Sequence, residues 1–578
     1  MPQITRRPVK SFSEHSLPPL LNRILSSRGV TSETEIQYKL GLLEKPSSLK
    51  GVDRAVDLLV AALQNQERLL IVGDFDADGA TSCALSILVL RAMGFHSVDF
   101  LVPNRFEYGY GLTPEIVDVA LESKPDIIIT VDNGIASIDG VAHANTQGIK
   151  VIVTDHHLQG EVLPEAEAII NPNQKACVFP SKNLAGVGVI FYLLSALRAK
   201  LRERNWFDDN KIKEPNMADY LDLVALGTVA DVVPLDHNNR ILVHQGIQRV
   251  RAGKTRPGIL ALLQVAGKNY QKLTSQDFGF IIGPRLNAAG RLDDISIGIQ
   301  CLLTDNIDLA RELASELDGL NRDRRAIESS MQKEALDSLE ALSLDESDLP
   351  WGLCLYQESW HQGVVGILAS RIKDKIHRPV IAFAKVDDST IKGSARSIAG
   401  LHIRDVLDRI ATQNPQVLQK FGGHAMAAGL TLSVDNFTAF SSLFDQVVRD
   451  ELDHEQLQET ILTDGELESH DFDLGIAHGL QQAGPWGQGF PEPLFDGEFL
   501  VVNQRLVGEK HLKLTLALPE KPQQLIDGIA FNINVEEWPA HEIERVRLVY
   551  QLSVNEFRGK ETLQLIVRYL EKRIAGES

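Results

Sequence analysis

Cysteine, long apolar runs and an excess of positive charge are scarce or missing in this 578-residue sequence. Its four cysteines lie far apart with no paired short spacing, which argues against a zinc finger and against a disulfide framework. We expect them to be buried thiols: Cys83, Cys177, Cys301 and Cys354. No stretch approaches the roughly 20 uncharged apolar residues of a membrane helix, and no apolar core follows the basic residues 1–10. We therefore expect a cytoplasmic protein that does not enter membranes.

The net charge of −20 bears on the kind of partner that the protein can bind. An acidic chain repels a polyanion at long range, so composition alone argues against nucleic-acid binding. This objection is overcome only if basic residues concentrate locally and metal ions neutralise an acidic site. The chain is also too long for one hydrophobic core and should divide into about three or four domains.

Residues 69–233 alternate short β-branched runs with amphipathic stretches, which is typical of a mostly parallel sheet covered by helices. The expected buried strands are residues 69–72, 127–131 and 151–153, and two of the expected helices are residues 80–93 and 114–122. Each of these strands is followed by a cluster of carboxylates.

The pattern of apolar residues predicts three further parts in the rest of the chain. Residues 307–342 keep apolar side chains on one helical face with Arg and Glu between them, which predicts one long connecting helix. A second α/β unit should follow, with strands at residues 352–356, 380–384 and 391–395 and a helix at residues 364–376. Beyond about residue 456 the apolar period becomes two and residues 557–560 indicate a hairpin turn, which together predict a small β-barrel.

The strongest chemical signal is Gly73-Asp74-Phe75-Asp76-Ala77-Asp78-Gly79, in which three acids alternate directly after an apolar strand. Alternate residues of such a loop point the same way, toward the carboxyl end of the strand, where open α/β sheets bind ligands. Three carboxylates together are costly unless cations neutralise them, and hard ions such as Mg²⁺ or Mn²⁺ prefer oxygen ligands. We therefore expect a divalent metal site here.

Two other interpretations of this motif are a solvated acidic loop and a calcium loop. The calcium interpretation is weakened because the twelfth position, counted from Asp74, is Leu85 and not a glutamate. A nucleotide-binding loop is weaker still, since the Gly-x-Gly-x-x-Gly pattern is absent.

Three further polar clusters fall at the ends of later elements. They are Val131-Asp132-Asn133-Gly134, Asp155-His156-His157 and Gly227-Thr228-Val229-Ala230-Asp231. A single His after a strand is more often structural than a ligand, but two adjacent His beside several strand-end acids favour a metal site. Imidazole also shifts the preference from Mg²⁺ toward Mn²⁺.

These four clusters resemble the four motifs of the DHH phosphoesterase superfamily, named for its Asp-His-His triplet. Other stretches, spread over almost the whole chain, are similar to the RecJ exonucleases within it. They are Pro103-Asn104-Arg105-Phe106, Gly283-Pro284-Arg285-Leu286-Asn287-Ala288-Ala289-Gly290-Arg291, Trp360-His361-Gln362-Gly363-Val364-Val365-Gly366, Gly393-Ser394-Ala395-Arg396-Ser397, Phe421-Gly422-Gly423-His424 and Gly484-Pro485-Trp486-Gly487.

The resemblance implies an α/β protein with a parallel-sheet DHH catalytic domain, a long connecting helix, a second α/β domain similar to DHHA1 and a C-terminal OB-fold β-barrel. The expected segments are an N-terminal helical lead at 1–50, the DHH domain at 51–304, the connecting helix at 305–345, the DHHA1-like substrate-binding domain at 346–455 and the OB-fold-like domain at 456–578.

The resemblance also implies roles for individual residues. The metal ligands for two ions, Mn²⁺ or Mg²⁺, would be Asp74, Asp76, Asp78, Asp132, His156 and Asp231. Asp132 would bridge the ions, and the catalytic set would be Asp76, Asp132, His156 and His157, with His157 near the scissile phosphate. The residues that grip DNA phosphates would be Arg105, Arg285, Ser394, Arg396 and His424. Candidate DNA contacts on the barrel are Lys510, Lys513, Phe557, Arg558 and Lys560, for which a charged solvated face is an equally open interpretation.

The function implied is a metal-dependent 5′→3′ exonuclease that hydrolyses single-stranded DNA to 5′ mononucleotides. Its role would be in recombination and in mismatch and base-excision repair, as a monomer beside a single-strand-binding protein and a helicase. One alternative is a DHH-family oligoribonuclease or cyclic-dinucleotide phosphodiesterase, for which a connecting helix and a barrel would have no clear purpose. A further alternative is a non-catalytic scaffold that binds single strands, from which metal ligands would be expected to be lost.

Overall fold

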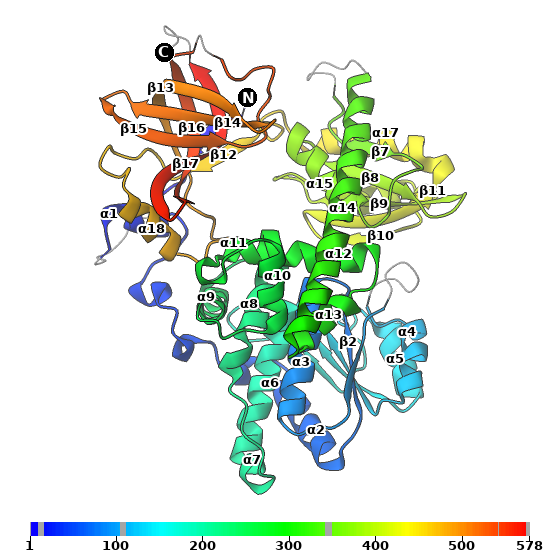
Figure 1. The fold of residues 1–578 in the computed structure, drawn as a ribbon. Helices are drawn as coiled ribbons and strands as arrows, with labels where there is room; N and C mark the ends of the chain where they lie inside the picture. Colours follow the sequence, from blue (N-terminus) through cyan, green and yellow to red (C-terminus); the bar gives the residue numbers. More distant parts are fainter. Residues whose placement is uncertain (1, 10–16, 104–110, 342–348, 541–542, 574–578) are drawn as a thin grey trace. The chain divides into compact units, whose positions relative to one another are not determined.

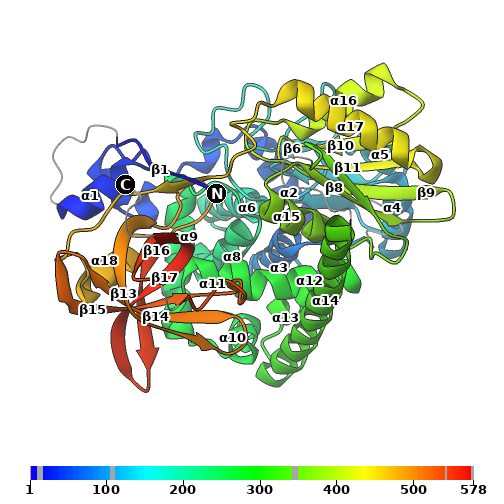
Figure 2. The same cartoon turned by 90° about the horizontal axis from the view of Figure 1, so that it is seen from above.

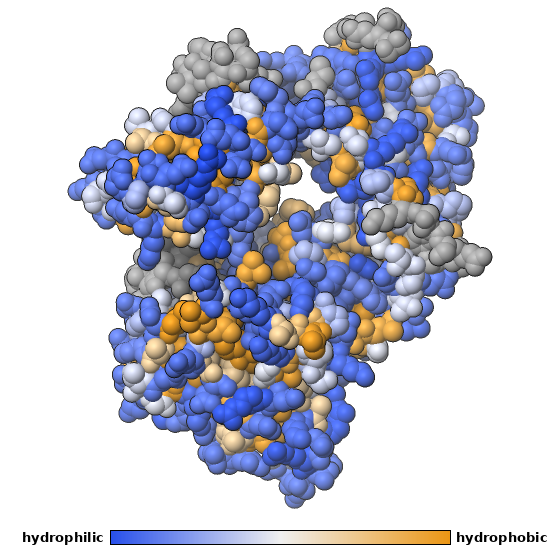
Figure 3. Space-filling view, turned by 180° about the vertical axis from the view of Figure 1, so that it is seen from behind, coloured by the Kyte–Doolittle hydropathy of each residue, from blue (hydrophilic) through white to orange (hydrophobic). Residues whose placement is uncertain are grey.

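The structure is a computed structural model that describes residues 2–9, 17–103, 111–341, 349–540 and 543–573 (Figure 1). The chain divides into two compact units. The smaller unit comprises Met1–Gln3, Arg291–Asp293 and Asp318–Ile461, and the larger unit comprises Ile4–Gly290, Asp294–Leu317 and Leu462–Ser578. Hydrophilic residues cover most of the face seen in Figure 3. Within the described ranges, no helix has both the length and the apolar character needed to cross a bilayer.

A five-stranded parallel sheet forms the centre of the larger unit, in the order β3-β2-β4-β5-β6. Its strands are β2 (Leu69–Gly73), β3 (Val98–Leu101), β4 (Ile127–Val131), β5 (Lys150–Thr154) and β6 (Ala168–Ile170). Every residue of β2 and β4 is buried, which explains their uninterrupted apolar sequences. The chain leaves β2 for one neighbour, β3, and returns on the other side as β4, so the strand order reverses between β2 and β4. Open α/β sheets bind ligands at such a point.

Helices cover both faces of this sheet (Figure 1). Helices α4 and α5 pack on one face through a core that includes Val117, Val141 and Val72, while α2, α3 and α6 contact the other. Helix α3 is buried on nearly all sides, and it starts three residues before the expected helix at 80–93 because Asp76 caps it.

The helices of this part of the chain are α1 (Pro19–Ser26), α2 (Val52–Asn65), α3 (Ala77–Ala92), α4 (Pro114–Ala120), α5 (Ile138–Thr146), α6 (Gly186–Glu203), α7 (Trp206–Asp209), α8 (Leu221–Ala230), α9 (His237–Arg251), α10 (Pro257–Val265), α11 (Ser275–Asp277), η7 (a π-helix, Phe278–Ile282), α12 (Gly283–Leu292) and α13 (Ser296–Leu303). Short 3₁₀ helices are η1 (Glu33–Ile36), η2 (Leu40–Leu42), η3 (Pro46–Ser48), η4 (Leu121–Ser123), η5 (Met217–Tyr220), η6 (Tyr270–Lys272) and, later in the chain, η8 (Val434–Asn436). The expected helix at 114–122 is thus α4 followed directly by η4.

The predicted long helix is confirmed as α14 (Ile307–Ala341), whose 35 residues extend for about 52 Å. In the smaller unit, its residues Met331 and Ala335 pack with α15 (Val365–Ile376) against one face of a second sheet. Helices α16 (Ile403–Gln413) and α17 (Phe437–Glu451) lie side by side on the other face (Figure 2).

The sheet of the smaller unit has the order β10-β11-β9-β8-β7, and only the β7–β8 pair is parallel. Its strands are β7 (Leu353–Tyr356), β8 (Val380–Lys385), β9 (Thr390–Arg396), β10 (Lys420–Gly423) and β11 (Ala427–Ser433). The first three match the strands expected from the sequence to within one residue at each end.

The C-terminal part of the larger unit is a closed barrel of strand order β13-β14-β15-β17-β16, as the period-two pattern predicts. Its strands are β13 (Phe495–Val507), β14 (His511–Leu518), β15 (Lys521–Ala530), β16 (Arg545–Phe557) and β17 (Lys560–Arg573). The predicted hairpin turn lies between β16 and β17. Helix α18 (Leu474–Gln482) packs against β16, and the short strands β1 (Gln3–Arg6) and β12 (Thr460–Thr463) pair with each other.

Candidate metal centre

The loop after β2 supplies the first carboxylates of the site. Asp76 is the N-cap of α3, and its Oδ1 accepts hydrogen bonds from the backbone N–H groups of Asp78 at 2.8 Å and Gly79 at 3.1 Å. A Cβ at position 79 would lie 2.2 Å from the carbonyl oxygen of Asp74, so only glycine fits this tight turn. The turn holds Asp74 and Asp76 at the carboxyl end of β2.

Asp78 is fully buried and is bound by the N-terminus of α6. Its Oδ2 accepts from the N–H of Gly186 at 2.6 Å, and its Oδ1 accepts from the N–H of Val187 at 2.9 Å. Burial and the charge of Asp76 raise the pKa of Asp78 to about 7, and the two N–H groups oppose that shift. The positive end of the 18-residue α6 dipole therefore offsets part of the charge of this acid.

Asp132 follows β4 in an unusual backbone conformation. Its φ of 62° lies in the left-handed region, which a non-glycine residue adopts only when its surroundings impose it. Its N–H donates to the carbonyl of Thr154 on β5 at 3.1 Å. A Cβ at Gly186 would lie 2.6 Å from the Cβ of Asp132, so the start of α6 presses against this side chain and fixes where its carboxylate lies.

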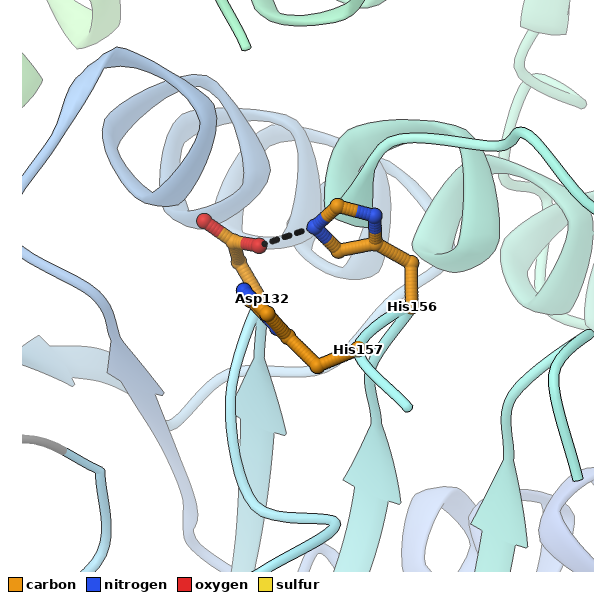
Figure 4. Close-up of side chains that lie close together, drawn as sticks. All are labelled: Asp132, His156 and His157. Carbon is orange, nitrogen blue, oxygen red and sulfur yellow. Dashed lines mark ion pairs between the residues drawn. The ribbon is translucent and has the colours of Figure 1, made fainter. Parts of the chain in front are cut away.

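His156 connects two carboxylates that are far apart in sequence. Its Nε2 lies 3.1 Å from Oδ1 of Asp132 and 3.4 Å from Oδ2 of Asp231, which is the C-cap residue of α8. The imidazole ring points toward the Asp132 carboxylate in Figure 4. Asn173 donates to the carbonyl of His156 at 2.6 Å, which helps to hold the backbone in place. One ring thus joins the ends of β4, β5 and α8.

His157 is oriented by the first residue of its own triplet. Nδ1 of His157 lies 2.7 Å from Oδ1 of the buried Asp155, whose other oxygen accepts from the N–H of Ile135 at 2.9 Å. Burial favours neutral forms of both groups, but their mutual hydrogen bond and opposite charges outweigh it, so the pKa of Asp155 is lowered and that of His157 is raised. Asp155 therefore holds the His157 ring, a role that the sequence pattern did not separate from that of a ligand.

Three groups of potential ligands overlap at this position, and within each group the ligand atoms lie within 4.8 Å of one another. The groups are Asp74, Asp76 and Asp132; Asp132, His156 and His157; and Asp78, His156 and Asp231. Asp132 and His156 each belong to two groups, so the three form one continuous centre. The structure therefore brings together all seven residues that the sequence assigned to metal binding and catalysis.

The electrostatics of this centre favour cations. Burial, followed by the charges of neighbouring carboxylates, raises the pKa of Asp132 and of Asp231 well above the ordinary range. Several carboxylates in one buried place are costly as anions unless a cation neutralises them. Oxygen ligands with one or two imidazoles are the set that suits Mn²⁺ and Mg²⁺. The residues present thus fit a divalent metal centre.

The predicted phosphate-gripping residues are distributed over both units. Arg285 lies in α12 of the larger unit, is buried, and donates from Nη1 to the carbonyl of Ile281 at 2.6 Å. Ser394 and Arg396 lie on β9 of the smaller unit, and His424 lies in the turn between β10 and β11. Arg105 lies outside the described residues.

Arg396 lies beside Ser394 and the first turn of α15. Its Nη1 donates to Oγ of Ser394 at 3.0 Å and to the carbonyl of Ala395 at 2.8 Å, and burial lowers its pKa. Burial is the one cause of this shift, and among the described residues no neighbouring carboxylate raises the pKa of Arg396. A Cβ at Gly366, in the first turn of α15, would lie 2.8 Å from its Nη2 and 2.9 Å from Oγ of Ser394. A half-buried guanidinium therefore meets a helix N-terminus, and both groups attract anions.

The five barrel residues predicted to contact DNA lie at two turns and on β14. Lys510 lies in the turn between β13 and β14, while Lys513 is paired with Asp527 at 3.1 Å. Arg558 lies in the β16–β17 turn over the ring of Phe557, which is 67% exposed, and Lys560 begins β17. An exposed ring beside two cations can stack on a base and contact phosphate.

One further residue of the site was missed by reasoning from the sequence. Asn287, in α12, accepts a hydrogen bond from the N–H of Ala77 at 2.7 Å through Oδ1. Ala77 stands between Asp76 and Asp78 in the acidic loop. The signal available in the sequence was its place in the motif at residues 283–291, from which only the arginine was selected.

Comparisons with known proteins agree with this geometry. The DHH family N-terminal domain matches residues 68–228, the DHHA1 domain matches residues 352–450 and the RecJ OB domain matches residues 463–569. The chain is 55% identical to the single-stranded-DNA-specific exonuclease RecJ of Escherichia coli (strain K12), over 98% of both chains.

Two solved structures are also similar. The crystal structure of RecJ from Thermus thermophilus in complex with Mn²⁺ is 29% identical, with a TM-score of 0.79 over 96% of this chain and 76% of that one. The crystal structure of RecJ from the same organism in complex with Mg²⁺ is 27% identical, with a TM-score of 0.73 over 96% of this chain and 75% of that one. The expected architecture of DHH domain, DHHA1 domain and OB barrel is thereby confirmed, and the chain belongs to the RecJ family of the DHH phosphoesterases.

Proposed function

We propose that this protein is a metal-dependent exonuclease that hydrolyses single-stranded DNA from the 5′ end and releases 5′ mononucleotides. The observation that carries the proposal is the set of three overlapping ligand groups at the carboxyl ends of the strands. Relatives of the same family that are named single-stranded-DNA-specific exonucleases support it.

The ligands of the two ions, Mn²⁺ or Mg²⁺, would be Asp74, Asp76, Asp78, Asp132, His156 and Asp231, with Asp132 shared. When bound there, two divalent ions would activate a water for in-line attack on phosphorus and stabilise the leaving 3′ oxygen. His157, held by Asp155, would donate a hydrogen bond to the scissile phosphate from its other ring nitrogen. The chemistry then needs no protein nucleophile, and the buried Cys83 is left to packing.

The direction of attack would depend on a grip on the 5′ terminal phosphate. Arg396, Ser394 and the first turn of α15 would supply this grip, because a half-buried guanidinium and a helix N-terminus can bind a phosphate together. The other proposed phosphate contacts are Arg105, Arg285 and His424. A pocket that holds a chain end makes the enzyme an exonuclease and not an endonuclease.

The proposed route of the single strand answers the objection from the net charge. A cavity of about 1460 Å³ lies between the helices that follow α8 and the barrel, all within the larger unit. Its lining includes five cationic side chains: Arg7, Arg251, Lys268, Lys272 and Arg568. Among the described residues only two carboxylates line it, Asp277 and Glu492, although the chain has a net charge of −20. Phe280, which is 73% exposed, adds a surface for base stacking. Lys268 is paired with Asp277, and Lys272 is paired with Glu556 and Glu561, so the arginines of the lining are the main cations that would meet phosphates. A strand could pass along them toward Arg285, and the barrel residues Lys510, Lys513, Phe557, Arg558 and Lys560 would extend the contact.

The test of this function uses single strands labelled at either the 5′ or the 3′ end, incubated with Mn²⁺ or Mg²⁺. We expect the 5′ label to be released first, as a mononucleotide, and blunt duplex to resist attack. Degradation that starts from the 3′ end, or equal attack on duplex, would contradict the proposal. A comparison of turnover on a dinucleotide and on a long strand separates it from a short-oligonucleotide or cyclic-dinucleotide phosphodiesterase.

The second control concerns the site itself. Asp132→Ala removes a residue shared by two of the three ligand groups, so it should abolish cleavage while leaving strand binding largely intact. A non-catalytic scaffold, the remaining alternative, would show no nuclease activity in the wild-type protein either. Undiminished cleavage by Asp132→Ala would remove the proposed centre.

We further infer from the family that the protein acts in the cytoplasm as a monomer, in recombination and in mismatch and base-excision repair, beside a single-strand-binding protein and a helicase. Single-strand-binding protein supplies a direct test. Strand degradation should be stimulated, or at least unimpaired, when the substrate is coated with it, whereas complete protection of the coated strand would argue against this partnership.

A further inference from the structure

The segment formed by η7 and α12 touches two stretches of chain that carry metal-centre acids. Gly279, Gly283, Asn287 and Gly290 follow one another at intervals of four, four and three residues. Positions at this spacing lie about one helical turn apart and share a face. All four are small or short, so this face can approach other backbone closely.

The first half of this face packs against the end of α8, directly before Asp231. A Cβ at Gly279 would lie 3.3 Å from Cγ1 of Val229, and a Cβ at Gly283 would lie 3.1 Å from Cβ of Ala230. Both contacts are at or below the closest distance that side chains normally accept, so larger residues would push the end of α8 away.

The second half of the face packs against the acidic loop on both sides of Asp76. Oδ1 of Asn287 accepts from the N–H of Ala77 at 2.7 Å. A Cβ at Gly290 would lie 1.8 Å from the carbonyl oxygen of Phe75, closer than any real contact permits. Because Asp76 itself caps the N–H groups of Asp78 and Gly79, Asn287 supplies the acceptor for the N–H of Ala77.

Asp76 and Asp231 belong to different ligand groups of the centre. The distance between these groups sets the distance between the two ions that the proposed function requires. A single continuous helical segment that contacts the chain next to both residues can therefore control this distance. A π-helical turn within it, a feature that is frequent at functional sites, lies between α11 and α12.

We propose that η7 and α12 form a brace that fixes the spacing of the two halves of the metal centre, with Asn287 as its positioning residue. This inference rests on the proposed metal-dependent function and deepens it. Asn287 acts through the backbone between Asp76 and Asp78, because its Oδ1 accepts from the N–H of Ala77. Residues that orient ligands in this way typically change metal affinity or activity about 10- to 100-fold when they are replaced.

The test is isothermal titration calorimetry of Mn²⁺ into the metal-free, full-length protein. Asn287→Ala should raise the Kd for Mn²⁺ about tenfold or more, because the N–H of Ala77 loses its acceptor and the loop relaxes. Gly290→Ala should do the same by displacing Phe75. Asn287→Leu keeps about the same bulk but offers no acceptor to the N–H of Ala77, so it should lose Mn²⁺ affinity as Asn287→Ala does, whereas a purely steric role of the side chain predicts the wild-type Kd.

The matched control is Asn321→Ala. Asn321 is a buried asparagine in α14, and its Oδ1 accepts from Nη2 of Arg324 at 3.0 Å. Its replacement should lower the thermal midpoint but leave the Kd for Mn²⁺ unchanged. A folded Asn287→Ala variant with the wild-type Kd would overturn the brace, and so would an equal rise in Kd for Asn321→Ala. If Gly290→Ala does not fold, the two substitutions at Asn287 decide the question.

The same preparations separate this inference from the proposed function. Calorimetry needs no DNA, so the brace is judged on Mn²⁺ affinity alone. Labelled single strands then report the activity of the wild-type protein. Normal Mn²⁺ binding without release of the 5′ label would refute the exonuclease and leave the comparison of Kd values intact.

Discussion

Replacing Asp132 by Asn should make the metal-free protein more stable at pH 8 while destroying its activity. The reason is that Asp132 and Asp78 are buried and Asp231 is partly buried near them, and burial together with the charges of neighbouring acids raises the pKa of each. The pKa of Asp78 is about 7 against an ordinary 3.8. A difference of roughly 3 units corresponds to about 4 kcal/mol, since one unit is about 1.4 kcal/mol. Asp132→Asn removes a side chain whose ionisation in the folded state is opposed first by burial and then by the charges of Asp78, Asp76 and Asp231. Relief of one close repulsion between like charges should contribute about 1 to 4 kcal/mol.

The pH dependence has a definite sign. Each of these acids has a higher pKa in the folded than in the unfolded state, so the folded protein takes up protons first as the pH falls. The metal-free wild-type protein should therefore become more stable between pH 8 and pH 5, through the pKa of Asp78 at about 7. With Mn²⁺ bound the sign reverses, because protons compete with the metal for the same oxygens.

The assay is a thermal melt in excess chelator at pH 8 and pH 5.5, repeated with Mn²⁺. For Asp132→Asn in chelator we expect a melting midpoint about 1 to 4 °C above that of the wild type at pH 8. Between pH 8 and pH 5.5 the midpoint of the variant should rise less than that of the wild type. The control is Asp126→Asn, because a hydrogen bond from the N–H of Arg68 lowers the pKa of Asp126, so this change should destabilise slightly. A metal-free Asp132→Asn protein that melts below the wild type at pH 8 would refute the repulsion on which this rests.

Four further experiments test other parts of the protein. Arg396→Ala should raise KM about tenfold or more for 5′-phosphorylated strands, and Arg396→Lys should raise it as well, because Lys lacks the planar guanidinium. If the wild-type protein has equal KM values for strands with and without a 5′ phosphate, this role of Arg396 is contradicted. His157→Ala should lower kcat about 10²- to 10³-fold with little change in KM, as measured at saturating Mn²⁺; an unchanged kcat would place the ring outside the reaction. Phe280→Ala should weaken strand binding by about 1 to 3 kcal/mol in a fluorescence-anisotropy titration without metal, and wild-type affinity would remove the stacking role. Cys83 should resist thiol reagents in the folded protein, because burial raises its pKa, and rapid labelling would show that α3 opens.

The metal centre was predictable because of how parallel strands end. β2, β4 and β5 are short apolar runs, and each is followed at once by acids or histidines. In a parallel sheet these ends lie along one edge, so local sequence was enough to predict that Asp74, Asp132 and His156 meet. The long helix and the barrel were also predictable from local sequence, because the period of the apolar residues indicates the type of element and which of its faces is buried.

The contacts that hold the centre in shape were not predictable in this way. Asp78 is bound by α6, which starts 108 residues later, and Ala77 by Asn287, which lies 210 residues later. The local sequence around α6 or Asn287 does not indicate which residue either of them contacts. The start of α3 was misplaced for the same kind of reason, since Asp76 looked like a ligand only and is also the helix cap.

The closed barrel restricts how this part of the chain can recognise anything. Strand β13 pairs with β16 as well as β14, and β15 pairs with β17, so the ring of described strands has no open edge. Without an open edge in this ring, no extended peptide can be added to it as a sixth strand, and two such barrels cannot join edge to edge. The barrel must therefore bind a ligand through its side chains and turns and not by pairing its strands with the backbone of another polypeptide.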